Sequence, residues 1–253
     1  MGKILFTVSL VFILVFSLGD VNSQVRYTPP SITFGATLDA NFAINDAYGR
    51  VDVNSLTSYS MRSGKGFSVF AKFGLGSMKR HRITTSIQYN KMINYDANSN
   101  VFDEVFSGNP DDKMHTNFNI WTGAVGYEYL FGAPCCNKQS LGIAFTFNSI
   151  GSVEDKFTPT GKIENSFRVG MQINAGYEIV LGQGGQYGLA LGFKYNWANW
   201  FNPSNKINTP GATEVHLNDG LDPGGPGFNR WIGIVTVNVG FNFYTGVKQV
   251  FRK

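Results

Sequence analysis

The stretch NSFRVGMQINAGYEIVLG, residues 165–182, separates into two rows when every second residue is read. The first row is apolar and consists of Phe167, Val169, Met171, Ile173, Ala175, Tyr177, Ile179 and Leu181. The second row is mostly small or polar and contains Arg168 and Glu178. Because successive side chains of a β-strand point to opposite faces, the stretch predicts a long two-faced strand. An apolar row that points inward would make a soluble barrel or sandwich, and one that points outward would make a barrel in lipid.

The same alternation recurs along the chain and predicts about eight strands. The other stretches are SITFGATLDANFA (31–43), GFSVFAKFGLG (66–76), RITTSIQYNKMINY (82–95), TNFNIWTGAVGYEYLF (116–131), SLGIAFTFN (140–148), YGLALGFKYNWANW (187–200) and WIGIVTVNVGFNFY (231–244). Several match the roughly 9–11 residues with which a strand crosses a bilayer. In 116–131, Phe118 and Ile120 are out of phase with the later apolar residues. We expect a β-bulge near Trp121 to reconcile the two halves.

Short and long connections alternate between these stretches. The short connections are 76–81, 132–139 and 182–186, and the long ones are 44–65, 96–115, 151–164 and 201–230. Tight turns at one end and long loops at the other are typical of up-and-down barrels in the outer membrane. The prediction is an all-β fold: an eight-stranded antiparallel transmembrane β-barrel with long extracellular loops and short periplasmic turns.

The composition of the second row distinguishes a membrane barrel from a soluble eight-stranded barrel of the lipocalin type. A soluble exterior would be dense in Lys and Glu, whereas this row is small and mostly uncharged. Charged residues make up 15% of the chain, against roughly a quarter in an ordinary soluble domain. Aromatic residues gather near both ends of the apolar rows, as in the two girdles of membrane barrels. We therefore predict that the apolar face meets lipid.

The N-terminus predicts an exported protein. Lys3, the apolar run 4–18 and the small residues 21–23 have the pattern of a signal peptide. We expect a signal peptide at residues 1–23 and a single barrel domain at residues 24–253. An N-terminal transmembrane anchor is the alternative, but the run is short for a span and a cleavage-like site follows it. The net charge of +4 is too small to suggest nucleic acid as a partner.

Several charged residues fall on the row that is predicted to line the lumen: Asp39, Lys72, Arg82, Glu128, Arg168, Glu178 and Lys194. Buried charges must be paired or hydrated, because an isolated ion costs several kcal/mol. Strand neighbourhood suggests three pairs, which are Asp39 with Lys72, Arg82 with Glu128, and Glu178 with Lys194; Arg168, near the long loops, falls outside them. We predict an interior salt-bridge network that closes the lumen or gates a very narrow pore.

Most other acids fall in the long connections, whereas the short turns and the tails carry only bases, among them Lys79, Arg80 and Lys138. These can be ordinary solvated loops. Alternatively, the acidic rim meets divalent cations among lipopolysaccharide phosphates, or a cationic partner.

Candidates for catalysis and for metal binding are few. None of His81, His115 and His216 falls on a predicted strand beside a Ser and an acid at matching height, so we predict no catalytic residue and no cofactor. Cys135 and Cys136 are adjacent, and a disulfide between neighbours would be strained. They are also too few for a tetrahedral zinc site, so no metal is predicted. Two small residues in a turn, or a redox or intermolecular thiol role, remain as readings of this pair.

In its strand alternation, aromatic girdles, long–short loop order and signal peptide, the chain resembles small outer-membrane barrels of the OmpA transmembrane domain, OmpX and OmpW type. The resemblance implies a non-enzymatic, monomeric protein of the outer membrane, in contact with its lipid and lipopolysaccharide, that has a structural role or binds an extracellular partner through the long loops. The OmpW type implies an alternative, a narrow channel for small, often apolar, solutes. A lipid-modifying enzyme is a weaker alternative.

Overall fold

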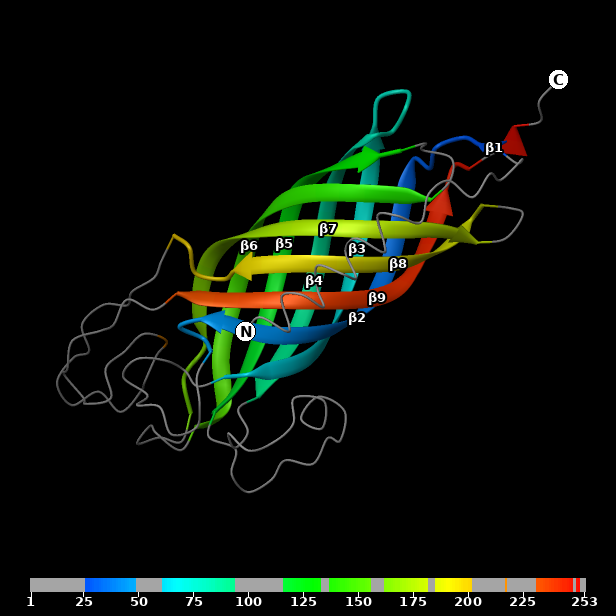
Figure 1. Ribbon diagram of the computed structural model, residues 1–253. Helices are drawn as coiled ribbons and strands as arrows, with labels where there is room; N and C mark the ends of the chain where they lie inside the picture. The colour runs from blue at the N-terminus through cyan, green and yellow to red at the C-terminus, as the bar shows by residue number, and fades with distance from the viewer. Residues whose placement is uncertain are drawn as a thin grey trace.

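The structure, a computed structural model, describes residues 26–48, 61–93, 116–132, 137–155, 162–181, 185–201, 217, 231–247 and 249–250. Eight of its strands form a closed antiparallel barrel in which each strand pairs with the next and β9 closes on β2 (Figure 1). They are β2 (Ile32–Asn45), β3 (Ser63–Leu75), β4 (His81–Ile93), β5 (Thr116–Phe131), β6 (Lys138–Asp155), β7 (Ser166–Leu181), β8 (Tyr187–Trp197) and β9 (Ile232–Thr245). The predicted fold class, an eight-stranded antiparallel up-and-down barrel, is confirmed. Among the described residues, no helix is long and apolar enough to span a membrane.

The barrel has two ends, which we name by their connections. At the turn end β3 finishes at Leu75 and β4 begins at His81, and at the loop end β2 finishes at Asn45 and β4 at Ile93. Two short strands, β1 (Arg26–Tyr27) and β10 (Gln249–Val250), pair with each other beyond the turn end (Figure 1). Cys135, Cys136, the predicted signal peptide and most residues of the predicted long loops lie outside the described residues.

The register of the strands sets their tilt. Cross-strand pairs followed from Arg82 around the barrel return to β4 at Met92, ten residues further along. Around eight strands, with the usual rise and spacing, this displacement corresponds to a tilt of about 40°. The value lies within the range of membrane barrels.

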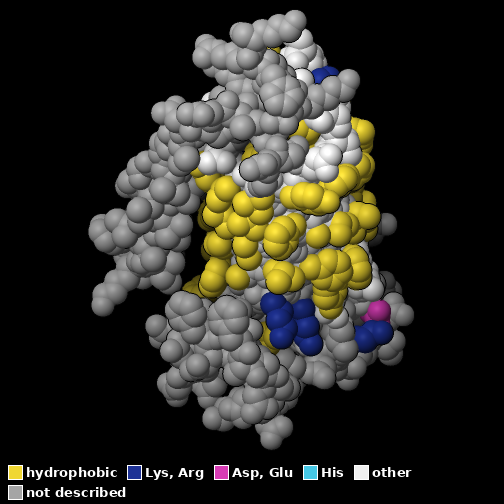
Figure 2. Space-filling model, turned by 90° about the vertical axis from the view of Figure 1, so that its right-hand side faces the viewer, with side chains coloured by type: hydrophobic (Ala, Val, Ile, Leu, Met, Phe, Trp, Pro, Cys, Tyr) yellow, Lys and Arg dark blue, Asp and Glu magenta, His cyan; other side chains and the backbone are white. Residues whose placement is uncertain are grey.

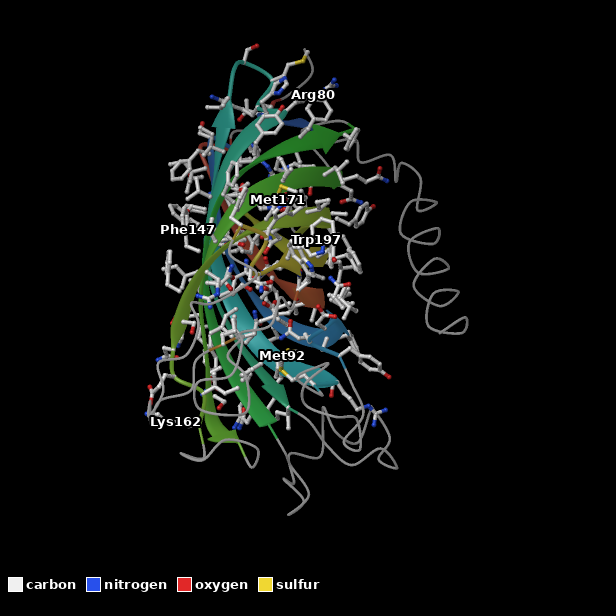
Figure 3. The ribbon with its side chains drawn as sticks, turned by 90° about the vertical axis from the view of Figure 1, so that its left-hand side faces the viewer. Arg80, Met92, Phe147, Lys162, Met171 and Trp197 are labelled. Atoms are coloured by element: carbon white, nitrogen blue, oxygen red, sulfur yellow. The ribbon has the colours of Figure 1, made fainter. Side chains whose placement is uncertain are left out.

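The apolar rows point outward, as predicted. Leu38, Phe167 and Phe241 expose 71%, 61% and 66% of their surface, whereas residues of the alternate row such as Thr37 and Asn242 are buried. On the face seen in Figure 2, hydrophobic side chains form a band across the middle of the barrel. Phe147 lies outside the barrel wall, while Met92 lies within it toward the loop end (Figure 3).

The predicted bulge near Trp121 is wrong. β5 pairs regularly with β4 from Asn117 to Tyr129 and with β6 from Phe118 to Phe131, and its register shift against β6 lies instead at Asn117 and Phe118. Phe118 and Ile120 are therefore on the inward row and fully buried, and Trp121 is on the outward row. Phe118 and Ile120 are out of phase with the later apolar residues of β5 because the inward row itself becomes apolar near the loop end.

Candidate functional site

The turn half of the lumen contains a buried arginine between two carboxylates. Arg82 lies near the start of β4, and Glu128 is its direct cross-strand partner on β5. Arg82 Nε donates to Glu128 Oε1 at 2.7 Å, and Nη2 donates to Glu178 Oε1, on β7, at 2.5 Å. Nη2 also donates to Glu128, and all three residues are at most 3% exposed. The guanidinium fork thus bonds both acids at once, which is the strong, charge-assisted geometry of such pairs.

Two lysines complete this group. Lys72 Nζ lies 3.2 Å from Glu128 Oε2 and 3.0 Å from Glu178 Oε1. Lys138 Nζ lies 3.9 Å from Glu178 Oε2 and 4.5 Å from the ring centroid of Tyr244, whose hydroxyl donates to Glu178 Oε2 at 3.3 Å. We call Lys72, Arg82, Glu128, Lys138, Glu178 and Tyr244 the charge network.

A second ion pair lies beside this network. Lys194 Nζ on β8 is 3.7 Å from Asp39 Oδ2 on β2, and it donates to Ser68 Oγ at 2.9 Å. Ser68 donates in turn to Asp39, and Thr37 Oγ1 donates to the other carboxylate oxygen at 2.7 Å. Asp39 therefore receives two hydroxyl donors as well as its counter-ion.

Two of the three predicted pairs are wrong. Asp39 is bonded to Lys194 rather than Lys72, and Glu178 to Arg82 and Lys72 rather than Lys194. The register explains the first error: the partner of Asp39 on β3 is Gly66, six residues from Lys72 and so about 20 Å away along the strand. In a narrow barrel, long side chains reach across the lumen, so height matters more than strand neighbourhood. The structure does bring Arg82 and Glu128 together, as their pairing predicted.

Sequence reasoning placed Lys138 in a short turn and so missed it. The residue is the first of β6, belongs to the same inward row as Ser140 and Gly142, and is 2% exposed. That alternation was a usable signal. Arg168, in contrast, lies on the inward row as predicted, is 7% exposed and donates to the backbone oxygens of Phe167 at 2.9 Å and Leu217 at 3.2 Å.

The middle of the lumen is polar but uncharged. Asn41 Nδ2 donates to Asn90 Oδ1 at 2.9 Å, and Thr236 Oγ1 donates to Asn41 Oδ1 at 2.6 Å. Across the barrel, Gln88 Nε2 donates to Gln172 Oε1 at 3.1 Å. Hydrogen bonds between amides and hydroxyls thus satisfy buried groups that would otherwise cost free energy.

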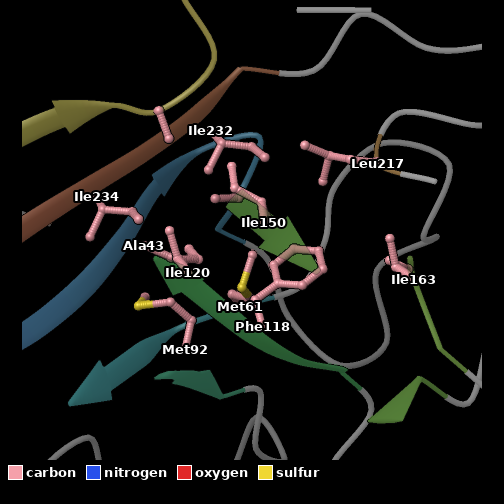
Figure 4. Close-up of a cluster of buried hydrophobic side chains, with 12 residues drawn as sticks. Ala43, Met61, Met92, Phe118, Ile120, Ile150, Ile163, Leu217, Ile232 and Ile234 are labelled. Atoms are coloured by element: carbon pink, nitrogen blue, oxygen red, sulfur yellow. The ribbon is translucent and has the colours of Figure 1, made fainter. Parts of the chain in front are cut away.

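The loop half of the lumen is filled by apolar side chains. This apolar cluster, shown in Figure 4, comprises Ala43, Ala47, Met61, Met92, Phe118, Ile120, Ile150, Ile163, Ala198, Leu217, Ile232 and Ile234. Each of these residues is at most 5% exposed. Most belong to the inward rows of β2, β4, β5, β6 and β9, and the others come from segments next to the strand ends. The cluster differs from the small and polar lumen that the alternation predicts.

A cavity of about 80 Å³ remains beside the charged residues, and Lys72, Glu128, Glu178, Lys194 and Asn174 are among the residues that line it. Its size suits several water molecules, since one water needs roughly 10–15 Å³ by this measure, and the charged side chains that line it can bind them. Hydration there would stabilise the lysines further.

In the described part of the chain, no three His, Cys, Asp or Glu side chains lie close enough together to bind a metal ion. His81 is exposed at the turn end, with Nδ1 2.5 Å from the hydroxyl of Tyr127. His115 and His216 lie outside the described residues.

The sequence matches no protein-family model and no curated protein. Solved structures do resemble it. Neisserial surface protein A has a TM-score of 0.48 and 13% identity over 85% of this chain and 97% of that chain. The outer membrane protein OprG from Pseudomonas aeruginosa has a TM-score of 0.46 and 7% identity over 86% and 98%. Ail, the attachment invasion locus protein of Yersinia pestis, has a TM-score of 0.41 and 6% identity over 85% and 99%.

These likenesses concern architecture, and function has to follow from this chain's own residues. A closed eight-stranded barrel with a hydrophobic band outside and polar and charged side chains inside fits an integral outer-membrane protein.

Proposed function

We propose that this chain is a non-enzymatic integral protein of the outer membrane, a monomer whose lumen is closed to solutes and whose loop end binds an extracellular partner. The observation that supports the proposal is that side chains occupy both halves of the lumen, the charge network in the turn half and the apolar cluster in the loop half. Conduction needs a continuous water path, which an apolar constriction interrupts by dewetting. The barrel is then a scaffold in lipid and lipopolysaccharide that presents its loop end at the cell surface.

The membrane placement is tested on the purified chain. We expect heat-modifiable migration in a denaturing gel, and β structure that forms only in detergent or lipid. The reason is the hydrophobic band, which has no counterpart in a soluble barrel. A chain that folds and stays soluble without detergent would contradict the placement.

The closed lumen is tested by single-channel recording in planar bilayers. The wild type is expected not to conduct. Glu128→Ala and Glu178→Ala are expected to unfold at lower temperature without conducting, because the apolar cluster still closes the other half. Glu128→Ala combined with Phe118→Ala is expected to conduct. A conducting wild type would refute the closed lumen, and unchanged stability in both single variants would refute the structural role of the charge network.

A narrow channel for small solutes is the second candidate, and the cavity beside Lys72 and Lys194 favours it. The inward rows of the described strands carry more cations than anions, with Lys72, Arg82, Lys138, Arg168 and Lys194 against Asp39, Glu128 and Glu178. A channel through this lumen would therefore prefer small anions. The reversal potential in a salt gradient would show that preference if the wild type conducts.

A further inference from the structure

The exterior of the barrel carries one pair of like charges. Among the outward rows of β2–β9, wherever the side chain is described, Lys65 on β3 and Lys91 on β4 are the only Lys, Arg, Asp or Glu residues. They are direct cross-strand partners. Lys65 is exposed and Lys91 is half-buried. The two charges on an otherwise uncharged face thus lie next to each other.

This arrangement is unfavourable without a counter-ion. Opposite residues of neighbouring strands have their Cβ atoms about 4.5–5.5 Å apart, and like charges there destabilise the sheet. No carboxylate of the described residues makes a salt bridge with either lysine. An anion held between the two ammonium groups would replace the repulsion by two attractions.

The depth of the pair in the membrane follows from its neighbours. Two residues toward the turn end, on the same outward rows, lie Phe67 and Tyr89, and Trp121 of β5 is the cross-strand partner of Tyr89. The rings pack together, with centroids 4.8 Å apart for Tyr89 and Trp121 and 5.9 Å for Phe67 and Tyr89. Such aromatic belts lie at the level of lipid headgroups. Figure 2 shows Lys and Arg side chains along the loop-end edge of the hydrophobic band.

We propose that Lys65 and Lys91 bind the phosphorylated headgroup of a lipid in the leaflet at the loop end, with its acyl chains against Phe67, Tyr89 and Trp121. The inference rests on the proposed function, that the barrel spans the outer membrane. Ammonium groups are strong donors to phosphate oxygens. Asn119, the cross-strand partner of Lys91, accepts the Tyr89 hydroxyl at 2.9 Å through Oδ1, and its amide nitrogen is a further donor. A lipid suits the site better than free phosphate because the site lies on the outward, apolar face.

The test uses the full chain folded in nonionic detergent and titrated with diphosphoryl lipid A, with bound lipid measured by native mass spectrometry. The double variant Lys65→Gln/Lys91→Gln is expected to bind diphosphoryl lipid A about 30-fold more weakly. This factor corresponds to about 2 kcal/mol, because each interfacial lysine contributes about 1 kcal/mol and a tenfold change in affinity is about 1.4 kcal/mol. The matched control is Lys162→Gln. Its lysine is near the loop end, is 50% exposed and pairs with Glu164 at 2.7 Å. The control is expected to bind like the wild type, and equal affinity in the double variant would overturn the proposal.

Two further ligands separate the chemistry from its source. The wild type is expected to bind dephosphorylated lipid A more weakly than diphosphoryl lipid A. The loss of affinity should equal the loss that the double variant shows with diphosphoryl lipid A. Equal binding of both lipids by the wild type would overturn the phosphate site. Inorganic phosphate is expected to displace lipid A only at far higher concentration. Displacement at the concentration of lipid A itself would overturn the lipid as occupant.

The difference in stability between the double variant and the wild type is expected to change sign when diphosphoryl lipid A is added. In nonionic detergent without anionic lipid, the double variant is expected to unfold at a higher urea concentration than the wild type, because the repulsion is gone. Diphosphoryl lipid A is expected to reverse that order by binding the folded wild type. A wild type that is already the more stable without lipid would contradict the like-charge premise.

The failure of this site and the failure of the membrane placement give different results. A chain that is folded and soluble without detergent refutes the placement and the site with it. A chain that folds only in detergent or lipid, but whose double variant binds lipid A like the wild type, refutes the site alone.

Discussion

The turn half of the lumen contains the charge network and the loop half contains the apolar cluster beside Arg168, although the same inward rows of the same strands line both. Arg82 and Met92 lie on one row of β4, and Glu128 and Phe118 lie on one row of β5. The first residue of each pair belongs to the charge network and the second to the apolar cluster. Alternation along a strand therefore determines which way a side chain points, but not which interactions it makes there.

The two halves respond differently to loss of a side chain. In the charge network, each carboxylate is buried only because donors surround it, so a lost partner leaves an uncompensated charge. In the apolar cluster, no partner is specific, and a lost side chain leaves a void whose cost depends on its volume. The comparison thus predicts separate, measurable signatures for the two halves.

The largest effect is expected for Arg82→Ala. Two buried acids, Glu128 and Glu178, would lose the cation that bonds both, and breaking a buried pair in this way costs about 3–5 kcal/mol. The measurement is urea-induced unfolding in lipid bilayers, followed by tryptophan fluorescence. Arg82→Lys is the control: it keeps the charge but not the fork and is expected to lose less. If Arg82→Ala lowers the free energy of unfolding by less than about 1 kcal/mol, the range of exposed ion pairs, then Lys72 and Lys138 suffice to compensate the two acids.

An effect at the lower end of the same range is expected for Phe118→Ala in the loop half. The side chain is fully buried in the apolar cluster, and truncation of a buried phenylalanine costs about 3 kcal/mol or more. Phe118→Leu, which keeps most of the volume, is expected to cost less than about 1.5 kcal/mol. The same unfolding assay applies. Equal stability of all three proteins would mean that the cluster does not pack the lumen tightly.

The sequence predicted the wall of the barrel much better than the contents of its lumen. Strand alternation gave the closed barrel and the outward apolar rows because both depend only on local periodicity. It also placed Asp39, Arg82 and Arg168 on the inward row, where they are buried. Partners across the lumen depend instead on how far the register is displaced around all the strands, and no local pattern contains that quantity. Strand neighbourhood therefore predicts Lys72 as the partner of Asp39, whereas the register brings Lys194 to it.

The apolar cluster did leave a trace in the sequence. Near the loop end, Ile232 and Ile234 are on the inward row of β9, and Phe118 and Ile120 are on that of β5. These strands are thus apolar on both faces there, which is the pattern of an element buried on both sides. In β5 this pattern imitates a bulge, because a lumen that is polar along its whole length would leave no place for inward apolar residues.

A smaller loss is expected for Lys72→Met at the edge of the charge network. Lys72 bonds both Glu128 and Glu178, but its side chain is 15% exposed and Arg82 still bonds the two acids. We expect a loss of about 1.5 kcal/mol, at the low end for hydrogen bonds to charged groups. Lys162→Met removes an exposed ion pair and is expected to have almost no effect. A loss as large as that of Arg82→Ala would place Lys72, rather than the arginine, at the centre of the network.

The smallest expected effect is the coupling between the two halves. Arg82 and Met92 are ten residues apart on β4, about 33 Å along the strand, and Met92 is the cross-strand partner of Phe118. Sites this far apart without shared partners usually add within about 0.5 kcal/mol. The double variant Arg82→Ala/Phe118→Ala should therefore lose the sum of the two single losses, as measured in a double-mutant cycle in the same bilayers.

A coupling above about 1 kcal/mol would contradict this independence, because the hydrogen-bonded amides between the halves, such as Asn41 and Asn90, would then have to transmit strain. Additive losses would instead mean that each half is stabilised independently of the other. In that case opening one half would leave the other shut, and only variants that open both halves would conduct.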